Sequence, residues 1–164
     1  MSQYVIMGVA GCGKSTVGQA LALDRGLTFV DGDNLHPRDN IAKMARGEAL
    51  DDTDRAPWLR KVGETLSEGT IIACSALKRA YRDTIRDTAG GEVTFLYLRG
   101  KRDTLARRMA DRDGHFMPAS LLDSQLDTLE EPQEDENVIV ADIEAKLDEI
   151  VAALSGGMKK EKTS

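Results

Sequence analysis

The chain has 164 residues, of which 41% are hydrophobic and 30% are charged, a composition typical of one globular domain. Its net charge of −6 argues against a nucleic-acid-binding surface, and no apolar run reaches the ~18 residues that a membrane-spanning helix needs. Its two cysteines are too few for a disulfide framework or a metal cluster, and the first strand begins too early for a signal peptide, so we expect a cytoplasmic protein.

Short apolar runs alternate with helical patterns along the chain. Strands are predicted at residues 3–7, 27–30, 70–74, 93–98 and 137–141, and helices at 14–25, 37–46, 53–67, 76–87, 101–112, 118–129 and 144–154. The strands lack strict alternation, which is typical of strands covered on both faces. The sequence therefore predicts an α/β fold, a five-stranded parallel sheet with helices on both faces. We expect one domain over residues 1–155 and a disordered polar tail over 156–164.

A glycine-rich segment follows the first predicted strand. Residues 8–15 read Gly-Val-Ala-Gly-Cys-Gly-Lys-Ser and fill every fixed position of the phosphate-binding pattern G-x-x-x-x-G-K-[ST]. Glycines let backbone N–H groups approach phosphate oxygens, and the following helix adds partial positive charge. The predicted nucleotide-binding residues are Gly8, Gly11, Cys12, Gly13, Lys14, Ser15 and Thr16. Lys14 is expected to reach the β and γ phosphates and Ser15 to ligate Mg²⁺, so the chain is predicted to bind a nucleoside triphosphate.

Two aspartates, Asp31 and Asp33, come directly after the second predicted strand. Ligands of open parallel sheets bind beyond the carboxyl ends of the strands, where these carboxylates would face the γ-phosphate. One could support Mg²⁺ and the other could accept a proton from an attacking hydroxyl, although either aspartate fits either role. An acidic turn without a catalytic role is the alternative.

Other classes of nucleotide-binding protein fit less well. The segment Asp87-Thr88-Ala89-Gly90 matches a GTPase switch motif, but it follows a polar helix end instead of a strand, and no guanine-reading Asn-Lys-x-Asp is present. Many ATPases carry an acidic residue after the strand that corresponds to residues 70–74, where this chain has Ser75. The layout favours a small-molecule kinase.

The order of several further motifs is more specific. They are Asp31-Gly32-Asp33-x-x-His36-Pro37, Asn40-x-x-Lys43-Met44, Gly47-x-x-Leu50-x-Asp52-x-Asp54-Arg55-x-Pro57-Trp58-Leu59, Cys74-Ser75-Ala76-Leu77-Lys78-x-x-Tyr81-Arg82-Asp83, Arg108-x-x-x-Arg112-x-Gly114-His115-Phe116 and Leu129-x-x-Pro132. Together with the phosphate loop, they resemble the P-loop gluconate kinases (gluconokinases) from about Tyr4 to Leu154. The resemblance implies the fold of the shikimate and nucleoside-monophosphate kinases, ATP and Mg²⁺ as cofactors, phosphorylation of D-gluconate to 6-phosphogluconate, and a homodimer.

Gluconate is a linear polyol with a carboxylate, so its site needs cations and polar groups. The predicted substrate-binding residues are Asp33, His36, Arg55, Lys78, Arg82 and His115. Arg55 and Arg82 are the first choices because an arginine fork suits a carboxylate. For each arginine, a place on a solvated helix face is an equal alternative to substrate binding. For His36, an imidazole that caps a turn is an equal alternative.

The segment 112–120 is predicted to form a lid over ATP, and Arg108 and Arg112 would aim guanidinium groups at the transferring phosphate. An exposed basic stripe is the alternative for this arginine pair. The predicted catalytic set is therefore Lys14, Asp31, Asp33 and Arg112, with Ser15 and Asp31 holding the metal. A kinase for another acceptor such as shikimate, or a non-catalytic nucleotide-binding module, stays possible at this point.

Overall fold

The computed structural model describes residues 3–9, 11–48, 50–110 and 119–162. The strands are β1 (Gln3–Met7), β2 (Thr28–Asp31), β3 (Thr70–Ala73), β4 (Val93–Arg99) and β5 (Val138–Asp142). The helices are α1 (Lys14–Arg25), α2 (Arg38–Ala45), α3 (Asp52–Thr65), α4 (Arg79–Thr88), α5 (Arg102–Ala110), α6 (Ala119–Thr128) and α7 (Leu147–Lys162), with 3-10 turns η1 (Gly32–Leu35) and η2 (Glu134–Glu136). The predicted lid segment lies almost wholly outside the described residues.

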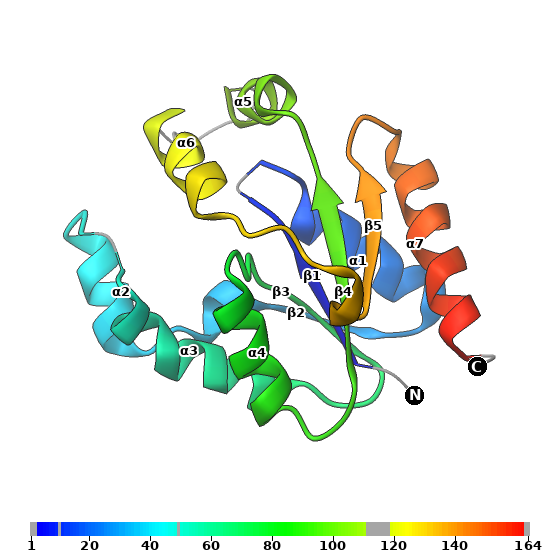
Figure 1. The fold of residues 1–164 in the computed structure, drawn as a ribbon, viewed down its shortest axis with the longest axis horizontal. Helices are drawn as coiled ribbons and strands as arrows, with labels where there is room; N and C mark the ends of the chain where they lie inside the picture. Colours follow the sequence, from blue (N-terminus) through cyan, green and yellow to red (C-terminus); the bar gives the residue numbers. More distant parts are fainter. Residues whose placement is uncertain (1–2, 10, 49, 111–118, 163–164) are drawn as a thin grey trace.

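The five strands form one parallel sheet in the order β2-β3-β1-β4-β5 (Figure 1). In β1, Tyr4 and Ile6 face a core shared with α1 and α7, while Val5 and Met7 face a second core shared with α3 and α4. Because successive side chains of a strand point to opposite faces, a central strand covered on both sides is apolar along most of its length. The predicted five-stranded parallel sheet with helices on both faces is confirmed.

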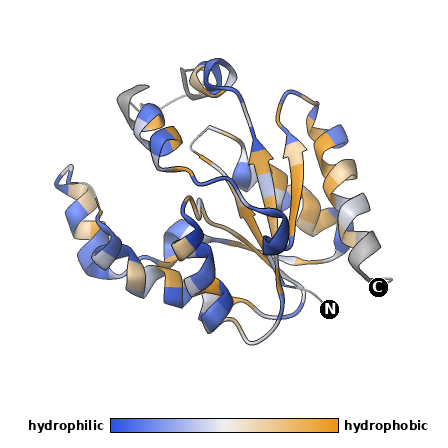
Figure 2. Cartoon of the chain, in the orientation of Figure 1, coloured by the Kyte–Doolittle hydropathy of each residue, from blue (hydrophilic) through white to orange (hydrophobic). Residues whose placement is uncertain are grey.

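Hydropathy follows this layering. In Figure 2 the strands are largely hydrophobic, whereas α2, α3 and α4 carry many hydrophilic residues. Within the described ranges, we find no helix long and apolar enough to cross a membrane.

The predicted disordered tail is wrong for residues 156–162, because α7 continues to Lys162. Ile150, Leu154 and Met158 recur every four residues and all three are buried in the core beside α1. Of the two adjacent glycines in this segment, Gly157 permits close packing. A Cβ atom on Gly157 would lie 2.9 Å from a side-chain carbon of Ile139 in β5.

The turn from β2 into η1 is closely packed against β3. A Cβ atom on Gly32 would lie only 2.2 Å from the Ala73 carbonyl oxygen, so no other residue fits there without movement of the backbone. Asp31 caps η1 by accepting a hydrogen bond from the Asp33 backbone N–H at 3.0 Å. Packing thus fixes the place of both aspartates at the carboxyl end of the sheet.

Candidate active site

The phosphate loop, residues 8–15, connects β1 to α1. Gly8 has φ 148°, and a Cβ atom there would lie 2.7 Å from Cys12 Sγ and 3.0 Å from the Leu98 carbonyl oxygen. Gly11 and Gly13 also have positive φ, which disfavours any residue with a side chain. Cys12 is buried, while Ser15 and Thr16 stand in the first turn of α1. The predicted nucleotide-binding glycines therefore have the backbone geometry that an anion-binding loop requires.

Lys14 folds back over this loop. Its Nζ donates hydrogen bonds to the carbonyl oxygens of Gly8 at 2.9 Å and Val9 at 3.2 Å. The ammonium group thus lies against the loop that is predicted to hold the phosphates. When a nucleotide binds, the ammonium group would exchange these two carbonyl oxygens for phosphate oxygens.

Strand register places Asp31 close to the phosphate loop. Asp31 lies beside Ala73 in β3, which lies beside Ile6 in β1, two residues before the loop begins. Two strand spacings amount to about 10 Å, a gap that a triphosphate and a metal ion can bridge. The predicted neighbourhood of loop and aspartates is thus consistent with the sheet order.

Cys74 lies between these two groups of residues. Its thiol is fully buried, which raises its pKa to about 12, while the charges of Lys14 and Asp33 act on it in opposite directions. Lys14 and Asp33 are therefore both within electrostatic reach of one buried side chain. The thiol itself stays protonated and is chemically inert at neutral pH.

The residues present fit a magnesium ion only if phosphates complete its coordination. Among the described residues, no group of three or more histidine, cysteine, aspartate or glutamate side chains gathers as a metal site. Mg²⁺ is usually held by one or two protein oxygens together with water and substrate phosphates. Ser15 in the first turn of α1 and Asp31 after β2 supply oxygens of that kind.

His36 follows η1 and is held in a defined orientation. Its ring stacks on Trp58 with centroids 4.1 Å apart, and Trp58 Nε1 donates to the Gly32 carbonyl oxygen at 2.8 Å. The Asn40 side-chain amide lies 3.3 Å from His36 Nδ1 and donates to the Asp54 carbonyl oxygen at 2.9 Å. Since a carbonyl oxygen can only accept, the Asn40 nitrogen is the donor, and Nδ1 of His36 must accept.

This arrangement leaves the Nε2–H of a neutral imidazole free to donate. Burial lowers the pKa of His36, with a smaller effect from Arg55 in the same direction, while Asp33 acts against both. The pKa therefore favours the neutral ring at physiological pH. The same interactions show that Asp33, His36 and Arg55, three predicted substrate-binding residues, lie near one another.

A second group of side chains, which we name the acceptor cluster, consists of Asp52, Arg55, Lys78 and Tyr81. The Tyr81 hydroxyl donates to Asp52 and accepts from Arg55 Nη1 at 3.2 Å. Lys78 Nζ lies 3.4 Å from Asp52, and the cations of Arg55 and Lys78 lie 5.6 and 5.5 Å from the Tyr81 ring centroid. The structure thus brings together Arg55 and Lys78 from different elements, α3 and the β3–α4 loop.

Hydrogen bonding by Tyr81 is the main cause of a lowered pKa at Asp52, and Lys78 adds to it. Asp52 therefore stays ionised and partly offsets the two cations around it. Asp52 and Asn40 are absent from the predicted substrate-binding residues, whereas Tyr81 is one of the polar groups that the sequence offers for the pocket. Asn40, Asp52 and Tyr81 all stand in the motifs that resemble the gluconate kinases, which was the signal for them. The charge pattern around Asp52 also fits an ordinary capping box, which Asp51 and Asp54 do form.

Arg82 does not belong to the acceptor site, which corrects the prediction that it binds substrate. Its side chain has no exposed surface, and it pairs with the equally buried Glu136 at 2.7 Å. It also donates to the carbonyl oxygens of Ala76 and Glu130, both at 2.8 Å. All parts of its guanidinium group are already engaged within the protein.

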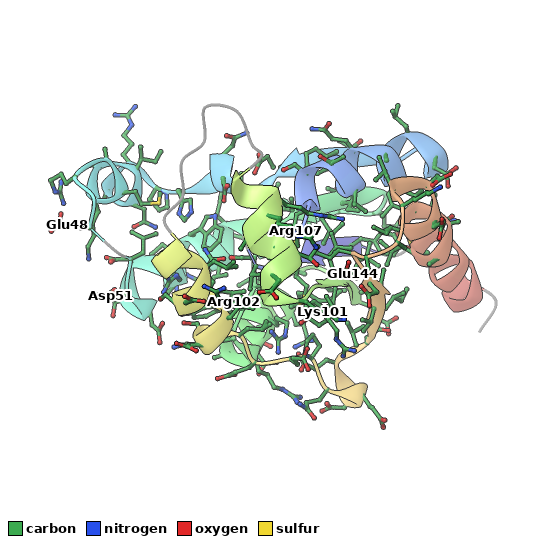
Figure 3. All side chains as sticks on the ribbon, turned by 90° about the horizontal axis from the view of Figure 1, so that it is seen from above. Glu48, Asp51, Lys101, Arg102, Arg107 and Glu144 are labelled. Atoms are coloured by element: carbon green, nitrogen blue, oxygen red, sulfur yellow. The ribbon has the colours of Figure 1, made fainter. Side chains whose placement is uncertain are left out.

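Arg108 lies beside the phosphate loop. A Cβ atom on Gly13 would lie 4.0 Å from Arg108 Nη1, and Arg108 Nη2 donates to the Ile143 carbonyl oxygen at 2.6 Å. Figure 3, viewed from above, shows α5 with Arg107 near the centre and the α2–α3 turn, marked by Glu48 and Asp51, at one end. The predicted residues Arg112 and His115 lie outside the described residues.

A parallel sheet of this order, with a phosphate loop after β1 and an acidic pair after β2, defines the class of small P-loop kinases. Comparison with known proteins agrees. Residues 10–152 match the shikimate kinase family. The chain is 43% identical to the thermoresistant gluconokinase of Escherichia coli K12, covering 97% of this chain and 94% of that protein.

Two further relatives are similar. A gluconokinase of Gluconobacter oxydans is 48% identical, covering 82% of this chain and 79% of that protein. The crystal structure of a gluconokinase from Sinorhizobium meliloti superimposes with a TM-score of 0.89 at 46% identity, covering 97% of this chain and 92% of the other. The chain therefore belongs to the shikimate kinase-like P-loop kinases and, among them, to the gluconokinase family.

Proposed function

We propose that this protein transfers the γ-phosphoryl group of ATP to a primary hydroxyl of D-gluconate, forming 6-phosphogluconate and ADP. The observation that carries the proposal is the acceptor cluster, in which Arg55 bonds to the Tyr81 hydroxyl, Lys78 bonds to Asp52, and both cations lie near the Tyr81 ring. Two cations around one tyrosine suit the carboxylate of a small acid. Similarity to the gluconokinases selects gluconate among such acids.

The nucleotide is held by the phosphate loop. Backbone N–H groups and Lys14 bind the phosphates, and Arg108 lies close enough to Gly13 to offset charge on the transferring group. Ser15 and Asp31 would hold Mg²⁺, which supplies charge neutralisation on the β and γ phosphates. The predicted role of Arg112 at the same phosphate remains a prediction.

The acceptor is oriented by side chains around Asp33. His36 presents a donating Nε2–H to a hydroxyl, and Asp33 accepts the proton of the attacking hydroxyl. Asp31 carries a hydrogen bond from the Asp33 backbone, whereas the Asp33 carboxylate is exposed, which supports Asp33 as the base. His115 is retained as a predicted acceptor ligand. A homodimeric assembly belongs to the same proposal on the resemblance to the gluconokinases alone, and a cytoplasmic location belongs to it on the cysteine usage of the sequence.

The test is a coupled assay of ADP release with Mg-ATP and a panel of acceptors. The panel contains D-gluconate, 2-ketogluconate, glycerate, shikimate and nucleoside monophosphates. Turnover on gluconate is expected, and it should fall about 10³-fold in the Asp33→Asn variant. Turnover on another acceptor alone would keep the chemistry and reject the substrate, and ATP binding without any turnover would favour a nucleotide-binding module.

A further inference from the structure

The buried arginine Arg82 contacts three separate segments of the chain. Its guanidinium group bonds to the Ala76 carbonyl oxygen before α4, to the Glu130 carbonyl oxygen after α6, and to the Glu136 carboxylate in η2. A buried charge needs a partner, and Glu136 alone supplies one. The bond to the Ala76 carbonyl oxygen is therefore not needed to neutralise the charge of Arg82.

Ala76 belongs to the β3–α4 loop, residues 74–78, which is held from several sides. The Gly8 backbone N–H donates to the Ser75 carbonyl oxygen at 3.3 Å, so the loop is attached to the phosphate loop. The Glu130 backbone N–H donates to the Leu77 carbonyl oxygen at 2.8 Å. Between these two attachments stands Ala76, whose carbonyl oxygen accepts from Arg82.

Ala76 itself has an unfavourable backbone conformation. Its φ of 46° lies in the left-handed region, which a residue with a Cβ atom adopts only when its surroundings hold it there. The residue is also buried, so water cannot replace Arg82 at its carbonyl oxygen. Arg82 therefore stabilises the strained point of this loop.

The loop carries a side chain of the acceptor cluster. Lys78 is its last residue and contacts Asp52, while Tyr81 follows in the first turn of α4. A change of backbone at Ala76 would move Lys78 relative to Gly8 and so relative to the phosphates. Phosphoryl transfer depends on such positioning, because misplacement of about 1 Å can cost roughly 100-fold in rate.

We propose that Arg82 is a positioning residue, which fixes the span between the phosphate loop and the acceptor cluster by holding Ala76 in its left-handed conformation. This inference rests on the proposed kinase function of the same site. It assigns to Arg82 an effect on catalysis without contact to either substrate.

Arg86 supplies a matched control one turn further along α4. It also pairs with Glu136, at 3.0 Å, and donates to the Glu136 carbonyl oxygen. No bond from Arg86 to the β3–α4 loop is found among the described residues. An effect that comes only from loss of stability should follow from either substitution, whereas a positioning effect should follow from Arg82 alone.

The experiment compares Arg82→Met with Arg86→Met in steady-state kinetics, ATP binding and thermal unfolding. We expect Arg82→Met to raise KM for gluconate or lower kcat by about 10- to 100-fold, with ATP affinity nearly unchanged. Arg86→Met should keep both kinetic constants close to those of the parent protein. Equal kinetic losses in the two variants, or parental kinetics in a folded Arg82→Met, would overturn the proposal.

If Arg82→Met does not fold, the double variant Arg82→Met/Glu136→Leu also removes the buried carboxylate that has lost this partner, and it tests the same point. Amide hydrogen exchange of residues 75–78 provides a readout that needs no acceptor. Exchange there should accelerate in either Arg82 variant and stay unchanged in Arg86→Met. Failure of the parent protein to phosphorylate gluconate would reject the proposed substrate, whereas unchanged exchange would reject the positioning role.

Discussion

The phosphate loop and the acceptor cluster are built from different parts of the chain. The phosphate loop is one short segment whose backbone is shaped by glycines at positive φ, with Lys14 held by carbonyl oxygens of the same loop. The acceptor cluster takes Asp52 and Arg55 from α3, Lys78 from a loop and Tyr81 from α4. One region depends on local conformation, and the other depends on how distant elements pack.

This difference predicts different responses to substitution. Changes in the phosphate loop should remove binding or catalysis as a whole, since its backbone groups act on the common nucleotide. Changes in the acceptor cluster should mainly alter affinity for the acceptor, because each side chain supplies one of several contacts. Four experiments follow; three test this contrast, and one tests the stability of the packing beside the acceptor cluster.

Lys14→Ala should have the largest effect. Loss of a charged group at the transferring phosphate should lower kcat by roughly 10⁴-fold, as for other groups that stabilise this transition state. Among the described residues, Lys14 bonds to groups of its own loop, the carbonyl oxygens of Gly8 and Val9 and the Cys12 sulfur, so the melting temperature should stay close to the parent value. Steady-state kinetics and thermal unfolding measure both, and near-parental turnover would contradict the phosphate role.

Asp33→Asn is expected to lower kcat by about 10³-fold, the typical contribution of a general base. The exposed side chain makes no known contribution to packing, and ATP affinity should change little. Isothermal titration with a non-hydrolysable ATP analogue measures that affinity. A variant that loses mainly ATP binding would instead assign Asp33 to the metal and leave Asp31 as the base.

Acid should weaken the ion-pair network around Glu136, which joins α4 to the segment between α6 and β5. Burial alone would raise the pKa of Glu136, but hydrogen bonds from Arg82, the Gln133 backbone and Arg86 outweigh it and lower the pKa to about 2. A lowered pKa means that the folded state binds the proton less well than the unfolded state. The stabilisation is therefore complete above pH 4.5 and lost as the pH falls toward 2.

A shift of this size corresponds to about 3 kcal/mol in the free energy of unfolding. Urea unfolding at several pH values between 2 and 7 measures it. Glu136→Gln should lower stability at neutral pH and flatten the dependence below pH 4.5. The other carboxylates are the same in both proteins, so the difference in unfolding free energy between the parent protein and Glu136→Gln should shrink as the pH falls below 4.5. A difference that stays constant across this range would contradict the assignment to Glu136.

Arg55→Ala should have the smallest effect of the four. Loss of one charge-assisted hydrogen bond should raise KM for the acceptor by about 10- to 100-fold and leave KM for ATP unchanged. Arg60→Ala is the matched control, since Arg60 lies exposed on the same helix. Equal changes in both variants, or a parallel loss of ATP affinity, would argue against the separation of the two regions.

The sequence predicted the sheet and the phosphate loop because both depend on local patterns. Strand β1 has the bounds expected from its apolar run, and the spacing of glycines in residues 8–15 encodes the loop conformation directly. The acidic pair after β2 was predictable for a related reason, since sheet topology brings strand ends together.

The acceptor side could be predicted only in part. Arg55 and Arg82 both stand near helix starts, and nothing in their neighbouring residues distinguishes them. Their roles differ because Arg82 forms a buried ion pair with Glu136, whereas Arg55 donates a hydrogen bond to the Tyr81 hydroxyl. Both partners are remote in sequence. The predicted tail from residue 156 was wrong for the same reason, because the packing of Gly157 depends on Ile139 in another element.

The close contact at Gly32 affects how the family should be compared. Its missing side chain leaves room for the Ala73 carbonyl oxygen at the point where the two aspartates are placed. We expect alignments of relatives to retain glycine at this position as strictly as the aspartates that flank it. Such conservation would reflect packing of one backbone against another. An invariant glycine between two candidate catalytic aspartates would therefore not itself be a catalytic residue.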